Sequence, residues 1–322
     1  MNFLSIPEAK RIARLEHPGR KVRMVLDTDT YNEIDDQFAV VYALLSPEHV
    51  SVEAIYAAPF YNNRSNGPED GMERSYEEIL RLLERLNIAP DGIVFRGSTG
   101  YLVDEQTSQD NAAVRDLIDK AMASPEDDPL YVVAIGAITN VASAIIMQPE
   151  IINKIVVVWL GGHALHWPDT QEFNLRQDVL AARVVFDCGV PMIQIPCMGV
   201  TSHLFTTKSE LDANVRGKNR IGDYLFEIYD GYTTDHYAYS KVIWDISTIA
   251  WLIDPAWVPT HLVHSPVLTD QVTWSVDHSR HLIRYAHYLY RDRIFADLFS
   301  KISSANLQGA APQDSVDGFN RS

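Results

Sequence analysis

Five acidic residues are crowded into the short stretch from residue 27 to residue 36. They are Asp27, Asp29, Glu33, Asp35 and Asp36. Carboxylates this close repel one another unless a cation or strong hydrogen-bond donors neutralise them. Because aspartate oxygens favour hard cations such as Ca²⁺ and Mg²⁺, the stretch predicts a metal site.

The segments on either side indicate how this acidic stretch is held. An apolar run at residues 22–26 predicts a buried strand, and residues 38–45 have the apolar spacing of a helix. The acids therefore lie on a strand-to-helix turn, which is where open α/β sheets bind ligands. An alternative is that Asp35 or Asp36 simply favours the helix dipole, but this explains one or two acids and not four.

Two other acidic motifs fit less well. An EF-hand loop starting at Asp27 requires glycine at its sixth position and glutamate at its twelfth, where the chain has Asn32 and Phe38. A phosphatase of the haloacid dehalogenase type begins with Asp-x-Asp-x-Thr/Val. Asp27 and Asp29 match that pattern, but Tyr31 replaces the last residue and the pair at 35–36 has no role.

The rest of the chain alternates between apolar strands and amphipathic helices, which predicts an α/β fold. We expect an open, mainly parallel, Rossmann-like sheet with helices on both faces and the site at the carboxyl ends of its strands. Residues 1–20 predict a helical extension and residues 21–302 a single domain. Residues 303–322 are rich in Gly, Ala, Ser and Asp, which predicts a disordered tail.

The acidic stretch resembles the N-terminal signature of the calcium-dependent, inosine-uridine preferring nucleoside hydrolases. That signature is a strand ending in Asp-x-Asp, a short Pro-Gly turn, and Asp-Asp before a helix. Here the turn is two residues longer and lacks Pro-Gly. Three later segments also resemble the family, in the same order: Gly136 to Asn140, Glu172-Phe173-Asn174 with Asp178, and Asp245, before which Trp244 replaces the family's histidine.

The resemblance implies a role for each matching residue. Calcium would be bound by Asp29, Asp36, Asp245 and the main-chain carbonyl of Ile135. Asp29 would be the general base that activates a calcium-bound water. The ribose hydroxyls would be held by Asp35, Glu172, Asn174 and Asn62, and Asp27 would support the turn.

The group that assists the leaving base is not fixed by the resemblance, because Trp244 stands in place of histidine. One hypothesis is aromatic stacking, with Trp244 and Trp167 as candidates. The other is that a different acid takes over, with His236 and His166 as candidates.

The predicted reaction is hydrolysis of the N-glycosidic bond of a ribonucleoside, or a related N-riboside, to free base and ribose, as in purine or pyrimidine salvage. One alternative is a non-catalytic, calcium-dependent protein that binds sugars or nucleosides. A less favoured alternative is the Mg²⁺-dependent phosphatase, for which no clear phosphate site is present. The preferred base remains open.

Composition limits the partners. The net charge is −16, from 27 basic and 43 acidic residues, which argues against nucleic acid and anionic membranes. The two cysteines have no metal-site spacing, and no segment predicts a signal peptide or membrane span, so we expect a reduced, cytoplasmic protein. The resemblance implies a homodimer or homotetramer.

Overall fold

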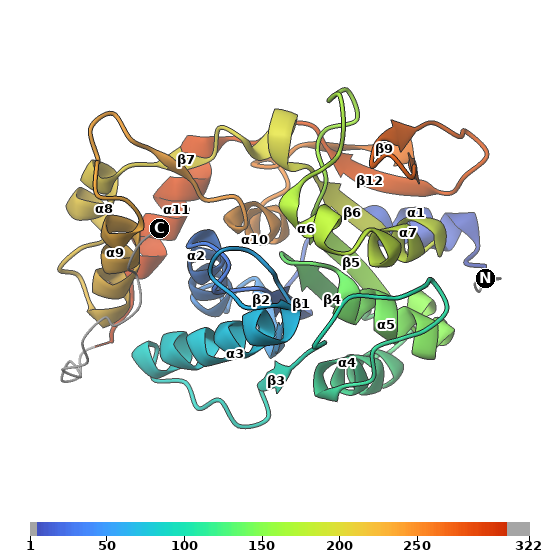
Figure 1. Ribbon diagram of the computed structural model, residues 1–322, viewed down its shortest axis with the longest axis horizontal. Helices are drawn as coiled ribbons and strands as arrows, with labels where there is room; N and C mark the ends of the chain where they lie inside the picture. Colours follow the sequence, from blue (N-terminus) through green and yellow to red (C-terminus); the bar gives the residue numbers. More distant parts are fainter. Residues whose placement is uncertain (1–4, 308–322) are drawn as a thin grey trace.

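An eight-stranded sheet runs through the centre of the computed structural model, which describes residues 5–307 (Figure 1). The strand order is β3-β2-β1-β4-β5-β6-β12-β9, and only β9 runs antiparallel to its neighbour. The predicted open, mainly parallel α/β fold is therefore confirmed. The strands of this sheet are β1 (Val22–Thr28), β2 (Val50–Ala57), β3 (Val94–Arg96), β4 (Leu130–Ala134), β5 (Ile155–Leu160), β6 (Met192–Ile195), β9 (Thr260–His264) and β12 (Leu282–Ala286).

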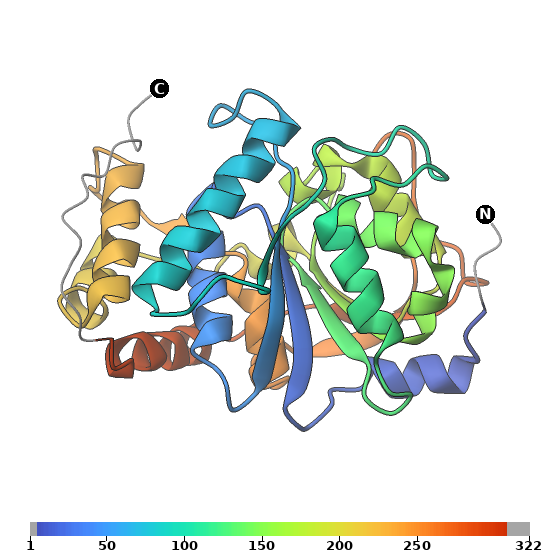
Figure 2. The same ribbon diagram turned by 90° about the horizontal axis from the view of Figure 1, so that it is seen from below.

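Helices cover both faces of the sheet, as Figure 2 shows. Cluster 1, the hydrophobic core on one face, includes side chains of α2, α3, α10 and α11, and cluster 2, on the other face, includes those of α4, α5 and α7. The helices are α1 (Glu8–Leu15), α2 (Asp35–Leu44), α3 (Pro68–Arg85), α4 (Ala112–Met122), α5 (Thr139–Met147), α6 (Phe173–Gln177), α7 (Val179–Asp187), α8 (Lys208–Asn214), α9 (Arg220–Tyr232), α10 (Ile246–Ile253) and α11 (Arg291–Ser304), with short helical turns η1 (Pro149–Asn153) and η2 (Cys197–Thr201).

Strand β5 shows why the central strands read as continuous apolar runs. Val156 and Val158 belong to cluster 1, whereas Val157 and Trp159 belong to cluster 2. Successive side chains of a strand point to opposite faces, so a strand buried on both sides needs apolar residues throughout.

The register of the central strands brings their carboxyl ends to one edge. Asp27 of β1 pairs with Tyr56 of β2 and Ala134 of β4, and Ala134 pairs with Trp159 of β5. The residues that follow these strands therefore meet at the same edge.

The ends of the chain differ slightly from the predicted boundaries. Helix α1 occupies the predicted extension, and Arg11 Nε donates to the carbonyl of Gly189 over 3.1 Å, which ties the helix to the domain. Helix α11 continues to Ser304, two residues past the predicted boundary at residue 302. Residues 308–322 of the predicted tail lie outside the described residues.

Two small antiparallel sheets lie outside the main one. They are β7 (Phe205–Thr206) with β8 (Lys241–Val242), and β10 (Val267–Leu268) with β11 (Trp274–Ser275). Together with α8 and α9, the first pair forms a lobe, residues 205–242, at one end of the molecule (Figure 1). Within residues 5–307, no helix combines the length and apolarity needed to cross a membrane.

Candidate active site

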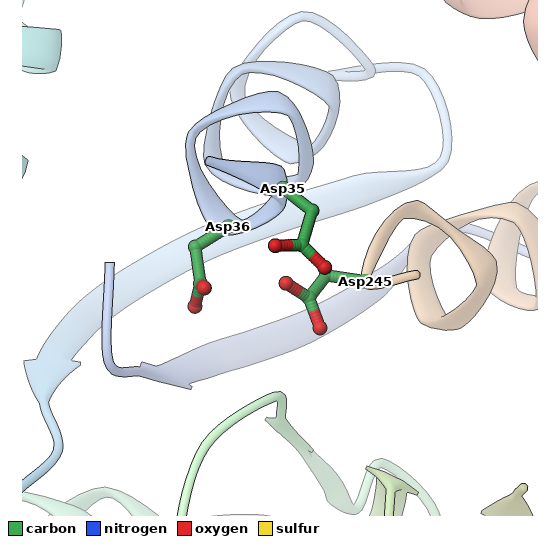
Figure 3. Close-up of side chains that lie close together, drawn as sticks. All are labelled: Asp35, Asp36 and Asp245. Carbon is green, nitrogen blue, oxygen red and sulfur yellow. The ribbon is translucent and has the colours of Figure 1, made fainter. Parts of the chain in front are cut away.

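Three aspartates from distant parts of the chain form an acidic centre. Asp35 and Asp36 lie in the first turn of α2, and Asp245 lies directly before α10 (Figure 3). One carboxylate oxygen of each lies within 4.8 Å of the others, and all three residues are buried. Asp245 makes no side-chain capping bond to α10, so a capping role does not explain it.

Asp29 reaches the same region from the end of β1. Both of its carboxylate oxygens are buried and, within the described part of the chain, neither is in a well-formed hydrogen bond, although Asn32 lies close enough to lower the pKa of Asp29. Asp36 is held on one side only: its Oδ1 accepts from Thr28 Oγ1 over 2.5 Å, and its Oδ2 has no partner in the same residues. Buried polar atoms without partners are costly, and each such atom calls for an explanation.

The electrostatics of the centre favour the binding of a cation. Burial, reinforced by the charge of Asp35, raises the pKa of Asp36 to about 8. Burial also raises the pKa of Asp35 to about 6, although Lys241 opposes the shift. Burial and then the charge of Asp36 raise the pKa of Asp29 well above its ordinary value. Buried carboxylates with unused oxygens suit a hard cation that neutralises them, so the residues present fit calcium.

The placement of these residues agrees only in part with the expected ligand set. Asp36 and Asp245 lie together as expected, but the third member of the group is Asp35, which was expected at the sugar. Asp29 lies outside this group. It is approached closely by the end of β4, because a Cβ added to Gly136 would lie 3.1 Å from Asp29 Cγ.

A cavity of about 340 Å³ opens beside the acidic centre. Seven of the predicted site residues line it: Asp35, Asn62, Ile135, Glu172, Asn174, Trp244 and Asp245. The cavity therefore joins the candidate cation site to the segments predicted for substrate.

Asn174 is locked in place at the carboxyl edge of the sheet. Its Nδ2 donates to the carbonyls of Ile135 and Leu160, over 3.1 Å in each case. Only the amide nitrogen can satisfy two carbonyls, so the orientation of the amide is fixed and its oxygen remains an acceptor. The Ile135 carbonyl, expected as a calcium ligand, thus already accepts one hydrogen bond.

Glu172 is held by main-chain donors. Its Oε1 accepts from Asn174 N over 2.8 Å, and its Oε2 accepts from Gly162 N and Leu175 N over 2.9 and 3.0 Å. The carboxylate therefore caps the N-terminus of α6, and Glu172 also lines the cavity. These donors lower its pKa, but burial outweighs them and the pKa is raised.

Asn62 links two loops at the cavity. Its Nδ2 donates to the carbonyl of Asn32 over 3.2 Å, and its Oδ1 accepts from Arg64 N over 2.8 Å. Asp27 lies deeper and is fully buried. Its Oδ1 accepts from Asn140 Nδ2 over 2.7 Å, and burial raises its pKa to about 7.

Of the four residues predicted to assist the leaving base, only Trp244 lines the cavity. Its main-chain N donates to Asp35 Oδ2 over 3.3 Å. His166 and Trp167 are exposed and do not line the cavity. His236 is also outside the lining, because its Nε2 lies 3.1 Å from the Asp230 carbonyl and 3.0 Å from the Asp230 carboxylate.

A histidine that the sequence analysis passed over does line the cavity. His163 Nδ1 accepts from Met198 N over 3.3 Å, so in the neutral ring the proton is on Nε2. Burial lowers the pKa of His163. Its position just after β5 and the glycine pair 161–162 was the available signal, because that places it at the carboxyl edge. Further unpredicted lining residues are Asn32, Glu33, Leu160, Gln171, Phe173, Arg176, Cys197 and Met198.

The fold and the site together define an α/β enzyme with an acidic cation centre beside a polar cavity. The chain belongs to the inosine-uridine preferring nucleoside hydrolase family, whose model matches residues 24–284. The family acts on the N-glycosidic bonds of ribonucleosides, which confirms the predicted class of reaction.

Relatives and solved structures agree with this assignment. The chain is 26% identical over 256 residues to the pyrimidine-specific ribonucleoside hydrolase RihA of Enterobacter sp. (strain 638), covering 72% of this chain and 79% of that protein. The plant nucleoside hydrolase PpNRh1 has the same fold, with a TM-score of 0.71 and 21% identity over 89% of this chain and 100% of that one. A purine-preferring ribonucleoside hydrolase from Gardnerella vaginalis has a TM-score of 0.68 and 22% identity, covering 88% of this chain and 98% of that one.

Proposed function

We propose that this protein uses Ca²⁺ and Asp29 to hydrolyse the N-glycosidic bond of a ribonucleoside, or a related N-riboside, to ribose and free base. The observation that carries the proposal is the state of Asp29. Its carboxylate is buried next to other buried aspartates, and among the described residues neither oxygen is in a well-formed hydrogen bond, although Asn32 lies close enough to lower its pKa. A base held ready in this way suits abstraction of a proton from water.

Asp29, Asp35, Asp36 and Asp245 would hold the cation. When bound, calcium would supply a positive charge that neutralises these carboxylates and polarises nearby water and sugar hydroxyls. Asp29 then takes the proton from the attacking water. Asp27, fixed by Asn140, keeps the end of β1 in place for that step.

The sugar is bound by groups whose positions are already fixed. The free amide oxygen of Asn174 accepts a bond from a ribose hydroxyl, and the Glu172 carboxylate offers further acceptor capacity. Asn62 lines the cavity from the loop after β2 and offers a further contact to the sugar. Negative groups around the sugar favour a transition state with oxocarbenium character, as in the hydrolysis of O-glycosides.

Trp244 and His163 both line the cavity, and we assign contact with the departing base to these two residues. Stacking on Trp244 spreads the charge that develops on the base. His163 has a lowered pKa and is neutral near pH 7, so it donates a hydrogen bond from Nε2 but is a weak source of a full proton. We therefore assign most of the stabilisation of the departing base to Trp244.

The relatives do not indicate which base this protein prefers, because they include pyrimidine-specific and purine-preferring hydrolases.

We further propose a homodimer or homotetramer that works in the cytoplasm. The family resemblance supports the assembly, and two buried free thiols, Cys188 and Cys197, support a reducing compartment.

The test is ribose release from a panel of purine and pyrimidine nucleosides, with added Ca²⁺ and with a chelator. Asp29→Asn replaces the base with a near isostere, and the exposed Asp91→Asn is the matched control. We expect release that disappears with chelator and falls by at least about a hundredfold in Asp29→Asn, the usual contribution of a general base, but not in Asp91→Asn.

Two results would contradict the proposal. Tight nucleoside binding without ribose release, with calcium demonstrably bound, would favour a non-catalytic binding protein. Release of phosphate from sugar phosphates with Mg²⁺ would favour the phosphatase.

A further inference from the structure

Glu33, at the centre of the lengthened acidic turn, makes an ion pair with a buried lysine. Lys241 Nζ donates to Glu33 Oε2 and also to the carbonyl of Val242, the latter over 3.3 Å. Tyr232 OH donates to Glu33 Oε1 over 3.3 Å. Lys241 is only 8% exposed, and a buried ammonium is stable only when it is paired.

The two partners of this ion pair lie shortly before the two chain segments that carry the aspartates of the acidic centre. Glu33 precedes Asp35 by two residues, and Lys241 precedes Asp245 by four. Cation binding requires ionised carboxylates, and in that state the repulsion of like charges in a buried site would drive the segments that carry them apart. The ion pair opposes that repulsion at the point where the segments meet.

The main chain of the turn is anchored from the opposite side. Arg64 Nη1 donates to the carbonyl of Glu33 over 2.9 Å, and Asn62 Nδ2 donates to the carbonyl of Asn32. With its main chain held by these two donors and its Glu33 side chain held by Lys241, the turn that leads into α2 is restrained from both sides. Among the described residues, no other Lys or Arg forms a salt bridge with a carboxylate that lines the cavity.

We propose that the Glu33–Lys241 ion pair, steadied by Tyr232, is a positioning device that holds Asp35 and Asp36 at cation-binding distance from Asp245. This rests on the calcium site of the proposed function. The pair sets the affinity for the cation, and neither residue is a catalytic residue. It also joins the 205–242 lobe, which carries Tyr232 and Lys241, to the carboxyl edge of the sheet.

The test is calcium affinity, measured by titration calorimetry on chelator-treated wild type and on Glu33→Gln, Lys241→Met and the double variant. Groups that orient metal ligands typically contribute about 10–100-fold to metal affinity, so we expect each single variant to bind Ca²⁺ at least about tenfold more weakly. The double variant should be no weaker than the weaker single variant, because one interaction is lost in all three. Asp110→Asn with Arg115→Met removes an exposed ion pair and should leave affinity unchanged.

Activity separates this device from a catalytic role. At saturating Ca²⁺ the variants should recover most of the wild-type kcat, because the cation itself then draws the aspartates together. If Lys241→Met does not fold, Glu33→Asp keeps the charge but shortens the side chain, and should show an intermediate loss of affinity.

Unchanged calcium affinity in the folded variants, or strictly additive losses of affinity, would overturn the positioning role of the Glu33–Lys241 pair. Neither result would affect nucleoside hydrolysis by the wild type. Absence of calcium binding in the wild type would overturn both the positioning role of the pair and the proposed cation site, whether or not the protein hydrolyses nucleosides.

Discussion

The side-chain amide of Asn140 donates a hydrogen bond to Asp27 Oδ1 over 2.7 Å and so joins the start of α5 to the end of β1. The oxygen of the same amide accepts from Ser98 N and Ser98 Oγ, both over 2.8 Å. Asn140 therefore connects three segments that follow or end strands of the sheet, and all of these groups are buried.

Replacing Asn140 with alanine should destabilise the protein. The change leaves Asp27 without the only side-chain donor that it has among residues 5–307 and leaves Ser98 without its acceptor, and an unsatisfied buried polar group costs about 1–3 kcal/mol. Urea denaturation would measure the loss in the free energy of unfolding. Asn214→Ala, on the exposed surface of α8, is the control and should change it little. Equal stability of Asn140→Ala and wild type would show that the Asp27 contact contributes nothing.

The stability of the cation-free protein should decrease as the pH rises. Burial is the largest cause that raises the pKa of Asp35 to about 6, of Asp27 to about 7 and of Asp36 to about 8, from an ordinary value of 3.8. Between about pH 4 and pH 8 the folded state therefore binds protons that the unfolded chain has released, and its stability falls with increasing pH.

Thermal melts in chelator should accordingly give a higher Tm near pH 5 than near pH 8. Because calcium requires ionised carboxylates, added Ca²⁺ should raise Tm more at the higher pH. Asp36→Asn removes the group whose pKa is raised furthest of the three and should flatten the pH dependence in chelator. A Tm in chelator that rises steadily from about pH 5 to pH 8 would contradict this account.

Two features of the structure could be predicted from the sequence: the grouping of Asp36 with Asp245, and the mainly parallel sheet. Asp36 and Asp245 were predicted together on the strength of motifs alone, and the structure places them so, on helices that start at the same edge. The mainly parallel sheet followed from the alternation of apolar strands and helices. The sheet follows from a local pattern repeated along the chain, whereas the pairing of Asp36 with Asp245 followed only from the resemblance to the family.

The leaving-group side could not be predicted in the same way, because it depends on which way loops turn. His166 and Trp167 follow the same strand as His163, yet only His163 lines the cavity. His163 is fixed there by the main chain of Met198, and His236 is held elsewhere by Asp230. No spacing within the sequence reports these long-range contacts.

Trp244 lines the cavity and is the residue that we assign to the departing base. Trp244→Ala should reduce turnover of natural nucleosides much more than turnover of a nitrophenyl riboside, whose leaving group is already activated. Stacking of an aromatic ring on a base is worth about 1–3 kcal/mol, so the difference between the two substrates should be about fivefold to 150-fold. His163→Gln should show a smaller difference, because burial lowers the pKa of His163 and leaves it neutral near pH 7.

Trp167→Ala is the matched control, since its ring is 38% exposed and lies outside the cavity lining. Steady-state rates on both substrates would be measured for all three variants at saturating Ca²⁺. Equal losses on the two substrates in Trp244→Ala would remove stacking as the means of activation. A large, substrate-dependent loss in His163→Gln instead, of the 10²–10⁴-fold size typical of general acids, would transfer the role to the imidazole, since only a proton donor becomes dispensable when the leaving group needs no proton.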